Sequence, residues 1–237
     1  FVPPPPELTV FRWVEVLYTL FLEAFPMIQR MLIFFFGLCM LSLGIATTTH
    51  AELGTGTLSS VALVLNRATG VSMGFFVFLT NFFFFVIQII IDSRAILQKA
   101  LRQLPICAAF GLIFDIAMMV TSFVAPETYV GQIGYVLLGT LGVGIGIASM
   151  VFARIAILPP EGVVLAVLGR WGGSFGTLRM GIDIFLVVVA STLSLILFGT
   201  VVGVREGTLI AALLGGQIAK RVLIVWGRLF PKHRVLD

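Results

Sequence analysis

The 237-residue chain is 59% hydrophobic and only 11% charged, with a mean hydropathy of +1.13. Because a soluble domain carries about a quarter charged residues, this composition excludes an ordinary water-soluble fold and predicts an all-α, polytopic membrane protein whose main partner is the lipid bilayer. The net charge of +4 favours contact with anionic lipids, and no basic cluster with interleaved aromatic residues indicates nucleic acid.

Residues 1–29 are predicted to form a proline-rich tail followed by an amphipathic helix. Four prolines at 3–6 favour an extended chain. From residue 8 onward, apolar positions recur at helical spacing, but charged residues such as Arg12 and Glu15 interrupt them. We therefore expect an interfacial helix rather than a span, and a candidate contact for a membrane-protein partner.

Six apolar stretches approach the roughly 20 residues that a helix needs to cross a bilayer. They are predicted at 31–49, 71–91, 105–124, 131–151, 180–203 and 208–226. Two further stretches, 54–68 and 158–171, are shorter and more polar. We interpret them as re-entrant or interfacial half-helices, which exist at membrane depth only where protein or water satisfies the backbone.

The distribution of basic residues predicts the orientation. If residue 30 is cytoplasmic and only the six spans cross, every Lys and Arg except Arg67 and Arg205 lies on the same side. Cytoplasmic loops carry the excess of Lys and Arg. We therefore expect a multi-pass protein of the bacterial cytoplasmic (inner) membrane, with both termini in the cytoplasm and a basic tail at 227–237 that faces anionic lipids.

An internal repeat divides the membrane region into two units, 30–124 and 125–226. At an offset of 102 residues, Gly37 meets Gly139, and the G-x-S-x-G pattern of 70–74 recurs at 172–176. Three spans in each unit is an odd number, so the second unit enters the membrane from the opposite side. The prediction is an inverted 3+3 repeat, an arrangement typical of secondary transporters with a site near the bilayer midplane.

The G-x-S-x-G pattern also occurs at the nucleophile of some hydrolases, where a strand precedes it and a helix follows. Both copies here lie between membrane segments without a His/Asp partner pattern, so we expect no enzyme activity and no catalytic residue. Two histidines, together with two cysteines inside apolar stretches, favour neither a metal site nor a cofactor.

Two segments carry a resemblance to a known family. The segment 53–60 (LGTGTLSS), followed by TGVSMG at 69–74, and the later segment 206–218 (EGTLIAALLGGQI) resemble signature regions of the YczE/YyaS/YitT family of bacterial membrane proteins. Family members often have proline and an acid after the first G-T-G, where this chain has Thr57 and Leu58. The resemblance implies a multi-pass membrane fold and little specific chemistry.

Polar residues at membrane depth are the candidate site, because a central ionisable residue costs at least about 2.5 kcal/mol. The candidates for substrate binding are Asp115, Asn81, Asp183, Gln217, Ser72 and Ser174, and the candidates for ion or headgroup contact are His50, Glu52 and Arg170. The repeat offset pairs Asn81 with Asp183 and Asp115 with Gln217. The alternative is that these residues only bond neighbouring helices or end helices.

Two local arrangements favour that alternative. Arg179 lies one helical turn before Asp183 and is placed to pair with it. Glu161 follows two prolines at the start of the second half-helix, where an acid suits the positive end of the helix dipole.

Two functions remain open on these grounds. The first is a small secondary transporter or permease for a small solute with a site at the repeat interface, which predicts a hydrated cavity that reaches Asp115 and Asn81. The alternative is a non-catalytic accessory or scaffold subunit of a larger membrane complex, in which these positions are packed dry.

Overall fold

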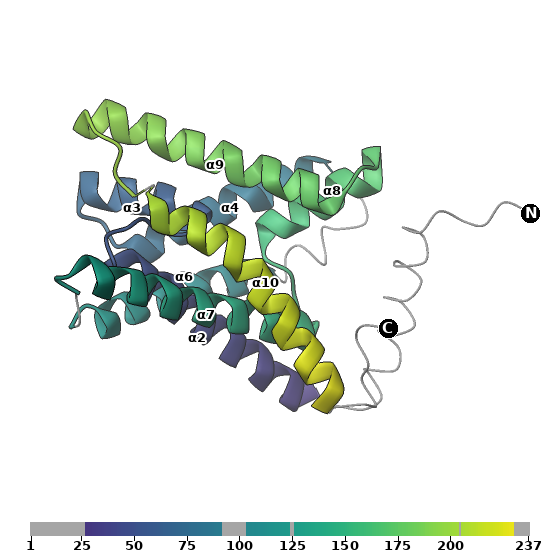
Figure 1. The fold of residues 1–237 in the computed structure, drawn as a ribbon. Helices are drawn as coiled ribbons and strands as arrows, with labels where there is room; N and C mark the ends of the chain where they lie inside the picture. Colours follow the sequence, from purple (N-terminus) through teal and green to yellow (C-terminus); the bar gives the residue numbers. More distant parts are fainter. Residues whose placement is uncertain (1–26, 92–102, 124–125, 204, 230–237) are drawn as a thin grey trace, which may run out of the picture.

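The computed structural model describes residues 27–91, 103–123, 126–203 and 205–229 (Figure 1). Within these ranges the chain forms eight helices: α2 (Met27–His50), α3 (Thr57–Thr69), α4 (Met73–Ile91), α6 (Gln103–Thr121), α7 (Tyr129–Ala153), α8 (Pro159–Trp171), α9 (Phe175–Phe198) and α10 (Glu206–Leu229). The all-α prediction is confirmed for this part of the chain. The proposed interfacial helix lies almost entirely outside it, and α10 extends into the predicted tail.

The protein has the helices of a multi-pass membrane protein. Among the described residues, five helices are long and apolar enough to cross a bilayer: α2, α4, α6, α7 and α9 from Thr177 onward. The sixth predicted span lies in the 24-residue helix α10, three of whose side chains fall outside the described set. A sixth crossing therefore stays a prediction.

Two short helices stand where the half-helices were expected. The helices α3 and α8 have 13 residues each. At about 1.5 Å per residue each is about 20 Å long, which is less than the roughly 30 Å of a hydrocarbon core. Glycine ends both, at Gly70 and Gly172, each with a positive φ that a residue with a Cβ rarely adopts.

The backbone repeats itself at the offset seen in the sequence. The helices α2, α3 and α4 begin 102 residues before α7, α8 and α9 (129 minus 27, 159 minus 57, 175 minus 73). In the described ranges the two non-glycine residues with positive φ are Glu52 (57°) and Arg154 (50°), again 102 apart. The two units therefore share helix starts and an unusual backbone conformation.

Glycines hold α2 and α7 in direct backbone contact. A Cβ on Gly37 would lie 2.9 Å from the Gly146 carbonyl oxygen, and a Cβ on Gly44 would lie 2.6 Å from that of Gly139. As one helix ascends in number the other descends, so the two helices are antiparallel. Small residues allow this close approach between membrane helices.

Exchange of the two units relates most of the other packing. The helix α3 packs on α9 as α8 packs on α4, and α2 packs on α6 as α7 packs on α10. One contact breaks this symmetry. The helix α4 packs closely on α6, with Gly74 against Gly111, whereas within the described ranges no comparable packing joins α9 and α10.

A buried arginine closes the end of α7. Arg30 is 4% exposed; its Nε donates to the Ala153 carbonyl at 3.1 Å and its Nη2 donates to the Arg154 carbonyl at 2.9 Å. A cation at this position suits the negative end of the helix dipole. Burial, and then the charge of Arg30, lower the pKa of the Arg154 guanidinium.

Substitution of Arg30 by glutamine should destabilise the protein by about 1–3 kcal/mol, because two charge-assisted hydrogen bonds to helix-end carbonyls are lost. Thermal unfolding of the purified protein in detergent measures the effect. Arg67→Gln is the matched control, since Arg67 is exposed in the last turn of α3. Equal melting temperatures for the two variants would contradict the capping role.

Candidate functional site

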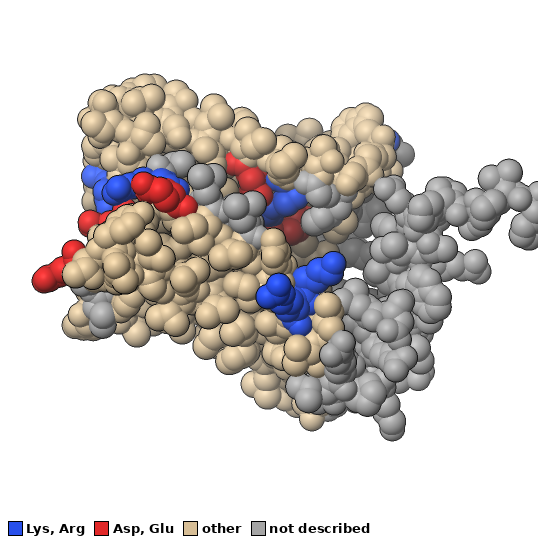
Figure 2. Space-filling model, in the orientation of Figure 1, with Lys and Arg blue, Asp and Glu red and all other residues tan. Residues whose placement is uncertain are grey.

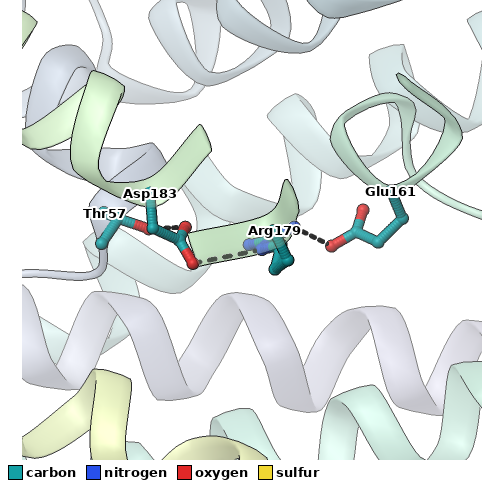
Figure 3. Close-up of polar contacts among 4 residues, drawn as sticks. All are labelled: Thr57, Glu161, Arg179 and Asp183. Atoms are coloured by element: carbon teal, nitrogen blue, oxygen red, sulfur yellow. Dashed lines mark hydrogen bonds and ion pairs between the residues drawn. The ribbon is translucent and has the colours of Figure 1, made fainter. Parts of the chain in front are cut away.

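A charged cluster lies between the two half-helices. Glu161 is the third residue of α8, Thr57 is the first residue of α3, and Arg179 and Asp183 lie one turn apart on α9. Figure 3 shows the four side chains in one row, with Arg179 between the two acids. The cluster therefore joins both half-helices to a single membrane helix.

Arg179 bonds both carboxylates. Its Nη1 pairs with Glu161 Oε1, and its Nε donates to Asp183 Oδ2 at 3.3 Å. Thr57 Oγ1 donates to Asp183 Oδ1 at 2.7 Å. The side chains are only 25% (Arg179), 31% (Glu161) and 29% (Asp183) exposed, so the ion pairs are partly shielded from solvent and stronger than pairs at an open surface.

The cluster lies inside the bundle rather than at its end. Asp183 is eight residues after Phe175, the start of α9 (183 minus 175), so it lies about 12 Å along the helix. The first turns of α3 and α8 both reach it, because Thr57 and Glu161 belong to those turns. In Figure 2, acidic and basic side chains gather between α9 and α10, where the packing of the two units differs.

The electrostatic balance of the cluster is uneven. Two carboxylates and one guanidinium give a side-chain charge of −1, which the positive ends of the half-helices offset in part. The helix α8 begins with Pro159 and Pro160, which have no N–H to donate. Glu161 Oε2 is accordingly buried without a hydrogen-bond partner among the residues that the structure describes.

Two amide side chains on α4 face the same region with unpaired oxygens. Asn81 is 1% exposed, its Nδ2 donates to the Val77 carbonyl at 2.8 Å, and its Oδ1 has no partner in the described part of the chain. Gln88 is 4% exposed and its buried Oε1 is likewise unpaired there. Its amide group lies against Gly162, the residue after Glu161, leaving no room for a Cβ.

Asp115 occupies a different place from the one expected. Its Oδ1 accepts a hydrogen bond from the Gly74 amide at 2.6 Å, so it caps the first turn of α4. Asn81 lies seven residues further along that helix (81 minus 74), about 10 Å away along the axis. The structure therefore brings Asp183, but not Asp115, to the charged cluster.

The remaining candidates for substrate binding lie at the surface. Ser72 is exposed and its Oγ accepts from the Phe75 amide at 3.2 Å. Ser174 is exposed at the start of α9, and Gln217 is exposed on α10. Their placement gives no sign of a shared site.

His50, Glu52 and Arg170 contact the ends of helices. His50 Nε2 lies 3.1 Å from the Met118 carbonyl oxygen, and the Glu52 carbonyl accepts from Arg205 Nη1 at 3.3 Å. Arg170 Nη1 donates to the Ile91 carbonyl at 2.8 Å at the end of α4. These contacts match the helix-ending interpretation, and no ligand contact follows from them.

Buried hydroxyl groups fix the loop that leads into α3. Thr55 Oγ1 lies 2.8 Å from Thr49 Oγ1 and 2.8 Å from Ser59 Oγ. The Thr55 amide also donates to the Gly203 carbonyl at 3.2 Å, in the loop before α10. The chain before α3 is thereby held in place, and with it the position of Thr57 at the cluster.

Sequence reasoning found part of this cluster. The spacing of Arg179 and Asp183 predicted their pairing, which the structure confirms. The contact from Glu161 to Arg179 and the hydrogen bond from Thr57 to Asp183 were missed, as was Gln88. The acid after two prolines was the one available signal, since it marked a helix start that lacks donors for its own carboxylate.

Comparison with known proteins supplies a family. Residues 28–223 match the model of a family described as a family of unknown function, DUF6198. The match covers most of the chain, so the chain belongs to that family. Neither a curated protein nor a solved structure matches it. No match tests the resemblance to the YczE/YyaS/YitT family, which stays a prediction.

Proposed function

We propose that this member of the DUF6198 family is a small secondary transporter or permease whose solute site is the Glu161–Arg179–Asp183 cluster. The observation that carries the proposal is the meeting of two half-helices at one partly buried charged cluster, with their first turns directed at it. Interrupted helices that end at a polar site between two units are typical of secondary transporters.

The inverted repeat is the second support. The helices α2 and α7 are counterparts at the 102-residue offset, and they contact each other antiparallel through matched glycines. An antiparallel contact between counterparts is what two units of opposite orientation produce. With six crossings, this arrangement leaves both termini on the cytoplasmic side of a bacterial inner membrane.

The one broken contact supplies a mechanism. If the two units exchange conformations, α9 closes on α10 while α4 separates from α6. This exchange would expose the cluster first to one side of the membrane and then to the other, as alternating access requires. The observed structure is then one of two states, with α4 closed on α6.

Two pairs of cysteines test the exchange. A Cβ on Gly111 would lie 3.2 Å from the Cβ of Phe78, close to the roughly 3.5–4.5 Å that a disulfide needs. In a chain with Cys39 and Cys107 replaced, Phe78→Cys/Gly111→Cys should cross-link rapidly. The counterpart pair, Met180→Cys/Ala213→Cys, should cross-link more slowly but substantially, as the second state is visited.

The control pair is Met180→Cys with Ile116→Cys, both lipid-facing at 58% and 60% exposure. Cross-links are measured by gel shift and mass spectrometry on protein reconstituted in lipid. Failure of the Met180/Ala213 pair above this control, while the Phe78/Gly111 pair reacts, would overturn the proposed exchange and leave a static membrane protein.

A further inference from the structure

Two unpaired oxygens meet at the first turn of α8. Glu161 Oε2 and Gln88 Oε1 are both buried acceptors that find no donor among the described residues. The Gln88 amide lies over Gly162, directly after Glu161 in the chain, and the residue is only 4% exposed. Each such oxygen costs about 1–3 kcal/mol when it stays unpaired.

A single proton supplies the missing donor. When the Glu161 carboxylate takes up one proton it becomes a carboxylic acid, and its O–H is then a donor while no other bond is formed or broken. Directed at Gln88 Oε1, that O–H satisfies both unpaired oxygens at once. A metal cation would need several further oxygen ligands, whereas the proton needs only these two.

We propose that Glu161 is the proton-binding group of this protein, with Gln88 as the acceptor that holds the protonated form. The inference rests on the proposed transport function and deepens it, since it makes the proton the coupling ion of the same site.

The surrounding charges give the proton a consequence. From α9, Glu161 faces Arg179, and beyond it Asp183; from α3 the cluster receives Thr57. The helix α4, which packs on α8, has no ionisable side chain along Met73–Ile91. Protonation changes the side-chain charge of the cluster from −1 to zero and removes the ionic contact that ties α8 to α9. Proton uptake would thereby release α9 to move toward α10.

Infrared difference spectroscopy of the full chain in lipid nanodiscs tests this assignment. As the pH rises, the carbonyl band of a protonated carboxyl group should disappear in the wild type, and Glu161→Gln should lack that component. Gln88→Leu removes the acceptor of the acid O–H, so its band should titrate about one pH unit lower. Glu127→Gln, which replaces an exposed acid, and Gln217→Leu should leave the component unchanged.

Two results would overturn the proposal: an unchanged carboxyl component in Glu161→Gln, or no shift in Gln88→Leu. Should Glu161→Gln fail to fold, Glu161→Asp keeps the titrating group and should move the band position. The spectra require no solute and no movement of α9. The proton site and the transport function therefore fail separately: cross-linking tests the exchange of states and the infrared titration tests the carboxyl group.

Discussion

Replacement of Gly44 by leucine is expected to abolish the folded protein. A Cβ at this position would meet the Val143 amide nitrogen and would lie 2.6 Å from the Gly139 carbonyl oxygen. Both are backbone atoms of α7, so no side-chain rotation relieves the overlap. Even alanine should cost about 1–3 kcal/mol, the usual effect of overpacking. Size-exclusion profiles and thermal unfolding in detergent measure both variants.

Gly181→Ala is the control for this experiment. Gly181 lies in the interior of α9, and a Cβ there would have no atom within 4 Å. The added methyl group should raise stability by up to about 1 kcal/mol through helix propensity. If Gly44→Ala proved as stable as Gly181→Ala, the close contact of α2 and α7 would be wrong.

Substitution of Arg179 by methionine is expected to cause the second large loss. It leaves the carboxylates of Glu161 and Asp183 without their cation inside the bundle. Removal of one partner from a buried ion pair costs about 3–5 kcal/mol, and partial exposure places this cluster near the low end. Thermal unfolding at neutral pH measures the loss.

A triple variant separates charge from packing. Arg179→Met combined with Glu161→Gln and Asp183→Asn carries no charge in the cluster, and Thr57 can still donate to the new amide oxygen. Its stability should return to within about 1 kcal/mol of the wild type, as neutral replacements of ion pairs often do. A triple variant as unstable as the single one would show that shape, and not charge, dominates the cluster.

The positions of the half-helices followed from local sequence. Length, glycine and proline marked both ends of α3 and α8, and the expected ranges 54–68 and 158–171 differ from the observed ones by three residues at most. Such signals are local, because a chain without enough apolar residues cannot cross the bilayer and a glycine with positive φ ends a helix. The repeat offset also transferred directly from sequence to helix starts.

The composition of the charged cluster did not follow from sequence. Whether Glu161 reaches Arg179 depends on how α8 lies on α9, and no periodicity within either segment encodes that contact. Asp115 shows the converse error of interpretation. Its position within an apolar stretch suggested a site residue, but its carboxylate serves the first turn of α4, a contact fixed by how closely Gly74 and Gly111 allow two helices to approach.

The glycine contact between α2 and α7 has a consequence for the origin of the chain. Gly37 faces Gly146 and Gly44 faces Gly139, and each pair becomes the other when the units are exchanged. A shorter ancestral chain of one unit would meet the same glycine surface on a second copy inserted upside down. Such a chain would assemble as a dual-topology homodimer, and fusion of two gene copies would then allow Arg179 and Glu161 to arise on one side only.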